Sequence, residues 1–150
     1  LLAMLAVGLW SALSFKQWSQ IIAAPFSFVL VLAIGALLAM NGVMAVGVEP
    51  TILVSLMVLG LLCATRLNLS ATLGSAIVAL FALAHGMAHG AELPVGQSAT
   101  LYMLGFLLST VIIHSLGIAL GVWLKQKSVW FTRVIGGATA AYGAALLLNV

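Results

Sequence analysis

Charged side chains are scarce in this sequence: only 5% of its 150 residues are Asp, Glu, Lys or Arg, while 65% are hydrophobic. A soluble domain carries about 25% charged residues, so this chain has too little polar surface to cover itself in water. Its five cations are also too few for a nucleic-acid-binding surface. The composition excludes a soluble domain and a nucleic-acid partner, and it predicts an integral membrane protein.

The sequence also has little cysteine and lacks the common catalytic motifs. The single cysteine, Cys63, excludes an internal disulfide, and we expect it to be a buried small hydrophobe. The sequence has no GxSxG, no phosphate-binding glycine loop, no HExxH and no CxxC. We therefore expect neither an enzyme nor an organic cofactor.

Long apolar runs are what the sequence does contain. They are continuous and do not alternate with polar residues, so they indicate helices and not a barrel. A span needs about 20 residues, and the first run is too short; it is either the end of a longer helix or a partial span. Pro25 is expected to begin the second helix. We predict an all-α membrane protein, a single transmembrane domain over residues 1–150, with about six helices at residues 1–14, 25–47, 51–65, 69–90, 98–124 and 130–150.

The few charges are segregated between the predicted loops. Both acids, Glu49 and Glu92, lie in even-numbered loops. All the cations lie in or beside the odd-numbered loops: Lys16, Arg66, Lys125, Lys127 and Arg133. Short cytoplasmic loops are rich in Lys and Arg, so we expect the odd loops in the cytoplasm and both termini outside. Three indoles fall near the same inner interface, where tryptophan is favoured: Trp18, Trp123 and Trp130.

His85, His89 and Glu92 are spaced at i, i+4 and i+7 near the end of the fourth run. This spacing places them within roughly 60° of one another on a helix. Imidazole nitrogen and carboxylate oxygen suit nickel, zinc, cobalt or copper(II) better than copper(I). The stripe is therefore a candidate metal site, and the alternative is a polar cap that meets water and lipid headgroups. Gly86 and Gly90 are spaced for close packing against a neighbouring helix.

His114 lies deep in the fifth run, where ionisable groups are costly and usually functional. It is a candidate relay ligand or proton carrier; the alternative is a packed histidine that bonds to a hydroxyl of Ser109, Thr110 or Ser115. Glu49 could complete a coordination shell or attract cations, or be a solvated loop acid.

The segment from His85 to Glu92 resembles the second-half signature of the HupE/UreJ family of hydrogenase and urease accessory nickel permeases. The opening LLAMLAVGLW and Glu49 before Pro50 are also similar. Similar residues in the fifth run are Tyr102, Gly105, Phe106, Thr110, His114 and Gly117. The resemblance implies a six-helix protein of a bacterial inner membrane with an outward N-terminus, which supplies nickel for hydrogenase or urease maturation. In that family a His-rich stretch ending in Asp-His directly precedes LLAM, and the sequence here begins at Leu1.

Together these observations predict a metal permease in which His85, His89 and Glu92 capture the ion and His114 receives it further in. Nickel is the expected cargo, with zinc or cobalt as alternatives. The expected partners are the lipid bilayer and the metal ion, together with either metallochaperones or a second copy of the chain. Two other functions are considered: a haem-binding membrane cytochrome, against which the depth of His114 argues, and a non-transporting accessory subunit.

Overall fold

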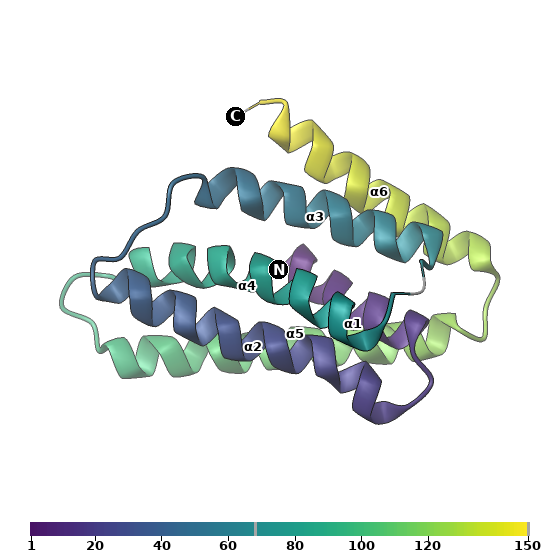
Figure 1. Cartoon of the computed structure of the whole chain (residues 1–150), viewed down its shortest axis with the longest axis horizontal. Coiled ribbons are helices and arrows are strands. Elements are labelled where there is room, and N and C mark those ends of the chain that lie inside the picture. The colour runs from purple at the N-terminus through teal and green to yellow at the C-terminus, as the bar shows by residue number, and fades with distance from the viewer. Residues whose placement is uncertain (68, 150) are drawn as a thin grey trace.

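The computed structural model describes residues 1–67 and 69–149, and all of its regular structure is helical (Figure 1). The helices are α1 (Leu2–Ser14), α2 (Trp18–Met40), α3 (Val48–Thr65), α4 (Ala71–Ala91), α5 (Ala99–Leu124) and α6 (Val129–Leu147). Four of them, α2 to α5, are long and apolar enough to cross a membrane, and α1 is a shorter apolar helix. The expected all-α membrane fold is confirmed.

Serine hydroxyls begin the later helices. The Oγ atoms of Ser70, Ser98 and Ser128 accept hydrogen bonds from backbone N–H groups in the first turns of α4, α5 and α6. Such caps satisfy donors that have no partner within the helix. All three helices begin within two residues of the predicted positions. The end predicted for the sixth helix, residue 150, lies outside the described residues.

The prediction for the start of the second helix is wrong. α2 begins at Trp18 and contains Pro25 as an internal residue. Proline has no N–H to donate, which would leave the carbonyl of Ile21 without its helical partner. The hydroxyl of Ser11 in α1 donates to that carbonyl at 2.5 Å. A neighbouring helix thus satisfies the backbone group, and this is what permits proline inside a membrane helix.

The same helix ends earlier than predicted, at Met40 and not at residue 47. Gly42 and Gly47 both adopt positive φ angles, 83° and 81°. Glycine enters this left-handed region without a steric cost and commonly ends helices there. The segment between them is a connection, and α3 starts at Val48.

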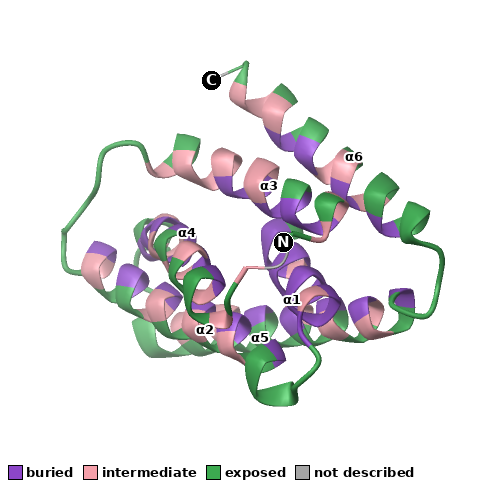
Figure 2. Ribbon diagram, turned by 45° about the vertical axis from the view of Figure 1, so that its right-hand side comes forward, coloured by how far each residue is buried: buried purple, intermediate pink, exposed green. Residues whose placement is uncertain are grey.

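α1 is the most enclosed helix of the bundle. Figure 2 shows it largely buried near the centre, and its Val7, Trp10 and Ala12 have no exposed surface. The outer faces of α2 and α5, in contrast, carry exposed large apolar side chains such as Phe26 and Leu108. Apolar side chains on the outside and a packed helix inside are the arrangement expected in lipid.

Glycines join the helices into three close pairs. A Cβ on Gly8 of α1 would overlap the carbonyl oxygen of His114 in α5, and one on Gly86 of α4 would overlap that of Leu32 in α2. Gly60 of α3 approaches the backbone of α6 in the same way. Small residues of this kind let membrane helices approach until their backbones touch. The pairs are α1 with α5, α2 with α4, and α3 with α6.

These contacts repeat between the two halves of the chain. Gly8 contacts His114, and the equivalent contact after the halves are exchanged is that of Gly86 with Leu32. In the same way, the contact of Gly117 with Leu5 corresponds to that of Gly35 with Leu83. For the third pair, the contact of Gly60 with Ala140 corresponds to that of Gly136 with Ala64. Exchanging α1–α3 with α4–α6 therefore reproduces the pairs. Because α1 and α4 run in opposite directions (Figure 1), the second half is an inverted copy of the first.

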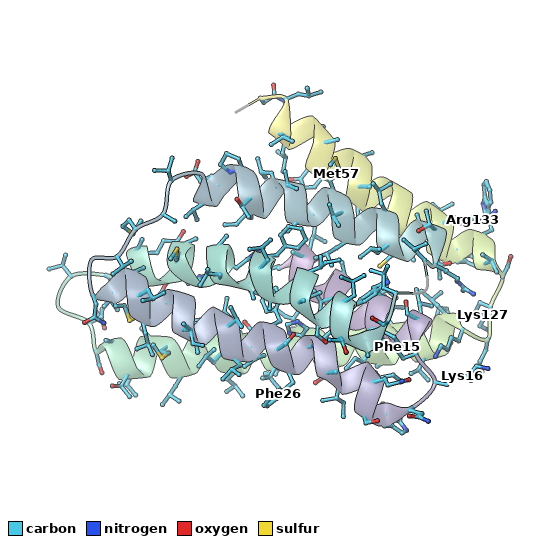
Figure 3. The ribbon with its side chains drawn as sticks, viewed as in Figure 1. Phe15, Lys16, Phe26, Met57, Lys127 and Arg133 are labelled. Carbon is cyan, nitrogen blue, oxygen red and sulfur yellow. The ribbon has the colours of Figure 1, made fainter. Side chains whose placement is uncertain are left out.

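Charge is segregated between the ends of the bundle. Figure 3 labels Lys16, Lys127 and Arg133 at one end. Arg66 and Lys125 are the C-caps of α3 and α5 at that same end. The two acids follow or begin helices at the opposite end, where Glu92 ends α4 and Glu49 lies in the first turn of α3.

Candidate metal-binding site

The predicted stripe runs along the last two turns of α4. His85 is buried, with 7% of its surface exposed, whereas His89 is 33% exposed and Glu92 68% exposed. The stripe thus leads from the outer end of the helix into the packed interior. Its three members differ in environment, so they cannot all be residues of a solvated cap.

His89 and Glu92 form the outer pair. Nδ1 of His89 lies 3.6 Å from Oε2 of Glu92. Metal ions such as zinc bind nitrogen and oxygen at about 2.1 Å, so two donors up to about 4 Å apart can share one ion. The pair is close enough to hold a metal ion together, and it would form an ion pair if the imidazole were protonated.

His85 and His114 form the inner pair, and each is anchored to its own helix. Nδ1 of His85 lies 2.9 Å from the carbonyl oxygen of Phe81, and Nδ1 of His114 lies 2.8 Å from that of Thr110. A carbonyl can only accept, so Nδ1 carries the proton in both rings. In the neutral tautomer Nε2 is then left with a free lone pair, which is the form that binds metals.

Nε2 of His114 is buried and has no hydrogen-bond partner among the described residues. His114 itself is 2% exposed. The predicted alternative was a histidine bonded to a neighbouring hydroxyl, but its bond goes to the Thr110 backbone and leaves Nε2 unused. An unpaired polar atom in a membrane interior is costly, and a passing cation would give it a partner.

Phe28 of α2 contacts both inner histidines. The centroid of its ring lies 5.5 Å from that of His85 and 5.0 Å from that of His114. Phe28 is completely buried. It therefore brings α2 into the site and fills the space beside both imidazoles.

A second aromatic contact links the outer pair to α5. The imidazole of His89 stacks on the ring of Phe106, with centroids 5.2 Å apart and an angle of 12° between the planes. The ring of Tyr102 packs edge-to-face against that of Phe106, with centroids 5.7 Å apart. Phe106 thus contacts both His89 and Tyr102 and links α4 to α5 at the outer end of the site.

Two hollows border the inner histidines. An open apolar groove of about 900 Å³ between α2 and α5 is lined by His114 together with Pro25, Ser115 and Val111. A smaller one of about 330 Å³ is lined by His85 and by residues of α1, α3 and α6. Each buried imidazole therefore has open space on one side.

The predicted ligands do not converge on one point. Within residues 1–67 and 69–149, no three His, Cys, Asp or Glu side chains lie close enough to hold a metal ion together. Glu49 is exposed in the first turn of α3, and it makes no ion pair in the described part of the chain. The arrangement is a series of donors along a line, and not a closed coordination cage.

Gly86 and Gly90 lie between the stripe residues, as predicted, and both pack against α2. A Cβ on Gly90 would overlap the carbonyl oxygen of Ala36. Close packing of α4 on α2 is what brings Phe28 against His85. Sequence reasoning missed Phe28 and selected Phe106 only by resemblance, because their importance depends on which helices become neighbours.

Comparison with known proteins gives one family and one curated relative. The family model described as HupE / UreJ protein matches residues 1–146. Protein HupE of Rhizobium leguminosarum bv. viciae is 40% identical over 150 residues, which cover 99% of this chain and 78% of that protein. A search of solved structures gives no match.

Proposed function

This chain belongs to the HupE/UreJ family, and from that premise we propose that it is a permease that carries nickel across a bacterial inner membrane for hydrogenase or urease maturation. Zinc and cobalt offer similar coordination chemistry and are the alternative cargoes. The metal ion is the substrate, and no organic cofactor is part of the proposal.

The observation that carries this proposal is the pair of buried histidines. His85 and His114 both lie inside a bundle of apolar helices, and both have Nε2 free for a metal. Ionisable residues at such depth are expensive and usually mark a substrate path. A purely structural histidine would be expected to use both of its nitrogens.

The proposed route starts at His89 and Glu92, at the acidic end of the bundle. From there the ion moves to His85, one turn further along α4, and then past the ring of Phe28 to His114. Single imidazoles in sequence hold a cation less tightly than a closed cage does, so the ion can leave each one. Water and Glu49 would complete its coordination at the entrance.

The direction of transport follows from charge. We infer that the end with Lys16, Arg66, Lys125, Lys127 and Arg133 faces the cytoplasm, because of the bias of cytoplasmic loops toward cations. Both termini and the acidic end with Glu49 and Glu92 then face the periplasm, where carboxylates attract the incoming cation.

Nickel influx into proteoliposomes tests the function. Wild-type protein should admit nickel, and His114→Ala should abolish most of the influx. Ser115→Ala is the matched control, because Ser115 is the exposed neighbour in the same turn of α5. Thermal unfolding of each variant checks that it is folded.

Three results would contradict the proposal. Absence of influx in folded wild-type protein would favour an accessory subunit, and a Soret band after purification would favour a haem-binding cytochrome. Equal influx in wild type and His114→Ala would remove the buried histidine from the route.

A further inference from the structure

Three cations from separate parts of the chain meet at the basic end. Lys16 follows α1, Arg66 ends α3 and Lys125 ends α5. The ammonium of Lys125 donates to the carbonyl oxygen of Phe15, which places it beside Lys16. Partial burial lowers the pKa of Lys125, and the charges of Lys16 and Arg66 lower it further. Lys125 thus lies close enough to Lys16 and Arg66 to be repelled by both.

No acid in the described residues offsets this repulsion. The one ion pair found there joins His89 to Glu92 at the opposite end. Each of the three cations follows the C-terminal end of a helix, so the helix dipoles offset a part of its charge. The cluster of Lys16, Arg66 and Lys125, which we call the basic cluster, is therefore a positive site that no acidic side chain among the described residues compensates.

Arg66 is also oriented with an unused donor. Its Nε donates to the hydroxyl of Thr132 at 3.1 Å, and Thr132 is completely buried in α6. Its Nη2 is buried and has no hydrogen-bond partner among the described residues. Leaving a buried charged donor unsatisfied is costly. The guanidinium is thus fixed with one N–H group that lacks an acceptor, which an anion drawn in beside it would supply.

The basic cluster lies at the level expected for lipid headgroups. Trp18 and Trp123 are exposed near it, at 62% and 55%, and indoles concentrate at the membrane–water interface. Lys127 is not part of the basic cluster. Its Nζ lies over the ring of Trp123, 5.2 Å from the centroid. The anion that reaches this level most readily is the phosphate of a lipid.

We propose that Lys16, Arg66 and Lys125 form a binding site for a phosphate group, supplied by an anionic phospholipid such as phosphatidylglycerol. Arg66 would donate from Nη2, and the two ammonium groups would neutralise the charge. This site is separate from the metal route and does not depend on the proposed transport.

The test compares the whole protein in nanodiscs of phosphatidylcholine with nanodiscs that also contain phosphatidylglycerol. Native mass spectrometry measures retained lipid, and thermal unfolding measures stability. Phosphatidylglycerol should stabilise the wild type. Lys16→Gln should weaken its binding about fivefold, the factor that corresponds to about 1 kcal/mol for one cation near a membrane surface. Lys127→Gln removes the same charge at the same end and should leave binding nearly unchanged.

Pure phosphatidylcholine provides the decisive contrast. There Lys16→Gln should unfold at the same or a higher temperature than wild type, because it relieves repulsion that no anion offsets. Arg66→Lys keeps the charge but loses the Nη2 donor. This variant should remain folded and lose part of the preference for phosphatidylglycerol over phosphatidylcholine. Inorganic phosphate added to phosphatidylcholine nanodiscs tests a soluble source: stabilisation that depends on Lys16 would support the site with free phosphate as its ligand.

Two outcomes would overturn the proposal. Equal loss of lipid preference in Lys16→Gln and Lys127→Gln would mean general attraction of the basic end to anionic lipid. Destabilisation of Lys16→Gln in both lipid mixtures would mean that Lys16 has a purely structural role.

Discussion

Pro25 and Ser11 lie on different helices, yet they are coupled through one backbone carbonyl. Ser11→Ala should destabilise the protein by about 1 kcal/mol, because the carbonyl of Ile21 loses its donor. In a Pro25→Ala background the new backbone N–H can take the place of the hydroxyl, so the cost of Ser11→Ala should fall toward zero. Unfolding in detergent of the four proteins of this cycle measures the coupling, and additive effects would contradict it.

Phe28 is the residue whose removal should change transport most directly. Its ring fills the space beside His85 and His114, so an ion that passes between them has to displace it. Phe28→Ala should raise nickel influx and weaken discrimination against other divalent ions. Leu32→Ala is the matched control, since Leu32 is also completely buried one turn further along α2. Equal effects of the two changes would indicate general loosening of the core.

The outer pair should respond to acid. A histidine must be deprotonated to bind a metal, so nickel capture by His89 and Glu92 should weaken as the pH is lowered. Titration calorimetry of purified protein at several pH values measures this, with His89→Ala as the comparison. Capture that is independent of pH and unaltered in His89→Ala would place the entrance elsewhere.

Sequence reasoning identified the histidines but not their surroundings. His85, His89 and His114 stand out because ionisable residues are so rare in this chain. Phe28 does not stand out, since an aromatic residue in an apolar run is ordinary. Its contacts depend on α2 packing against both α4 and α5, which no local pattern encodes.

At the scale of the helix, glycine contacts set how closely the pairs approach. Gly86→Ala should destabilise the protein by about 1–3 kcal/mol, because the added methyl would overlap the backbone of α2. Gly137→Ala on α6 is the matched control: a Cβ there meets nothing within 4 Å. It should be neutral or stabilising by up to about 1 kcal/mol through helix propensity. Unfolding midpoints of both variants check the contrast.

Most helix positions followed from the apolar runs, and the errors have local causes. A proline normally begins a helix, so the start of α2 at Trp18 could not be predicted without knowing that Ser11 satisfies the carbonyl of Ile21. The central place of α1 could not be predicted either. Its burial depends on α2, α3 and α5 packing around it, which no local pattern in its own sequence encodes.

For the molecule as a whole, the separation of charge predicts a single orientation. In a background without Cys63, a cysteine at Gln97 should react with an impermeant reagent added to intact cells, and one at Lys127 should react only after the membrane is opened. Gln97 lies in the connection that follows Glu92, and Lys127 at the basic end. The reverse pattern of labelling would invert the orientation and with it the proposed direction of nickel movement.

The inverted correspondence between α1–α3 and α4–α6 is the kind of symmetry on which alternating access rests in inverted-repeat transporters. If each half took the shape that the other has here, the bundle would adopt a second conformation in which its two ends exchange their shapes. The halves are not chemically equal, since Leu32 is the counterpart of His114 and Val7 that of His85. One set of imidazoles would thus serve both conformations, and the two conformations would differ in energy.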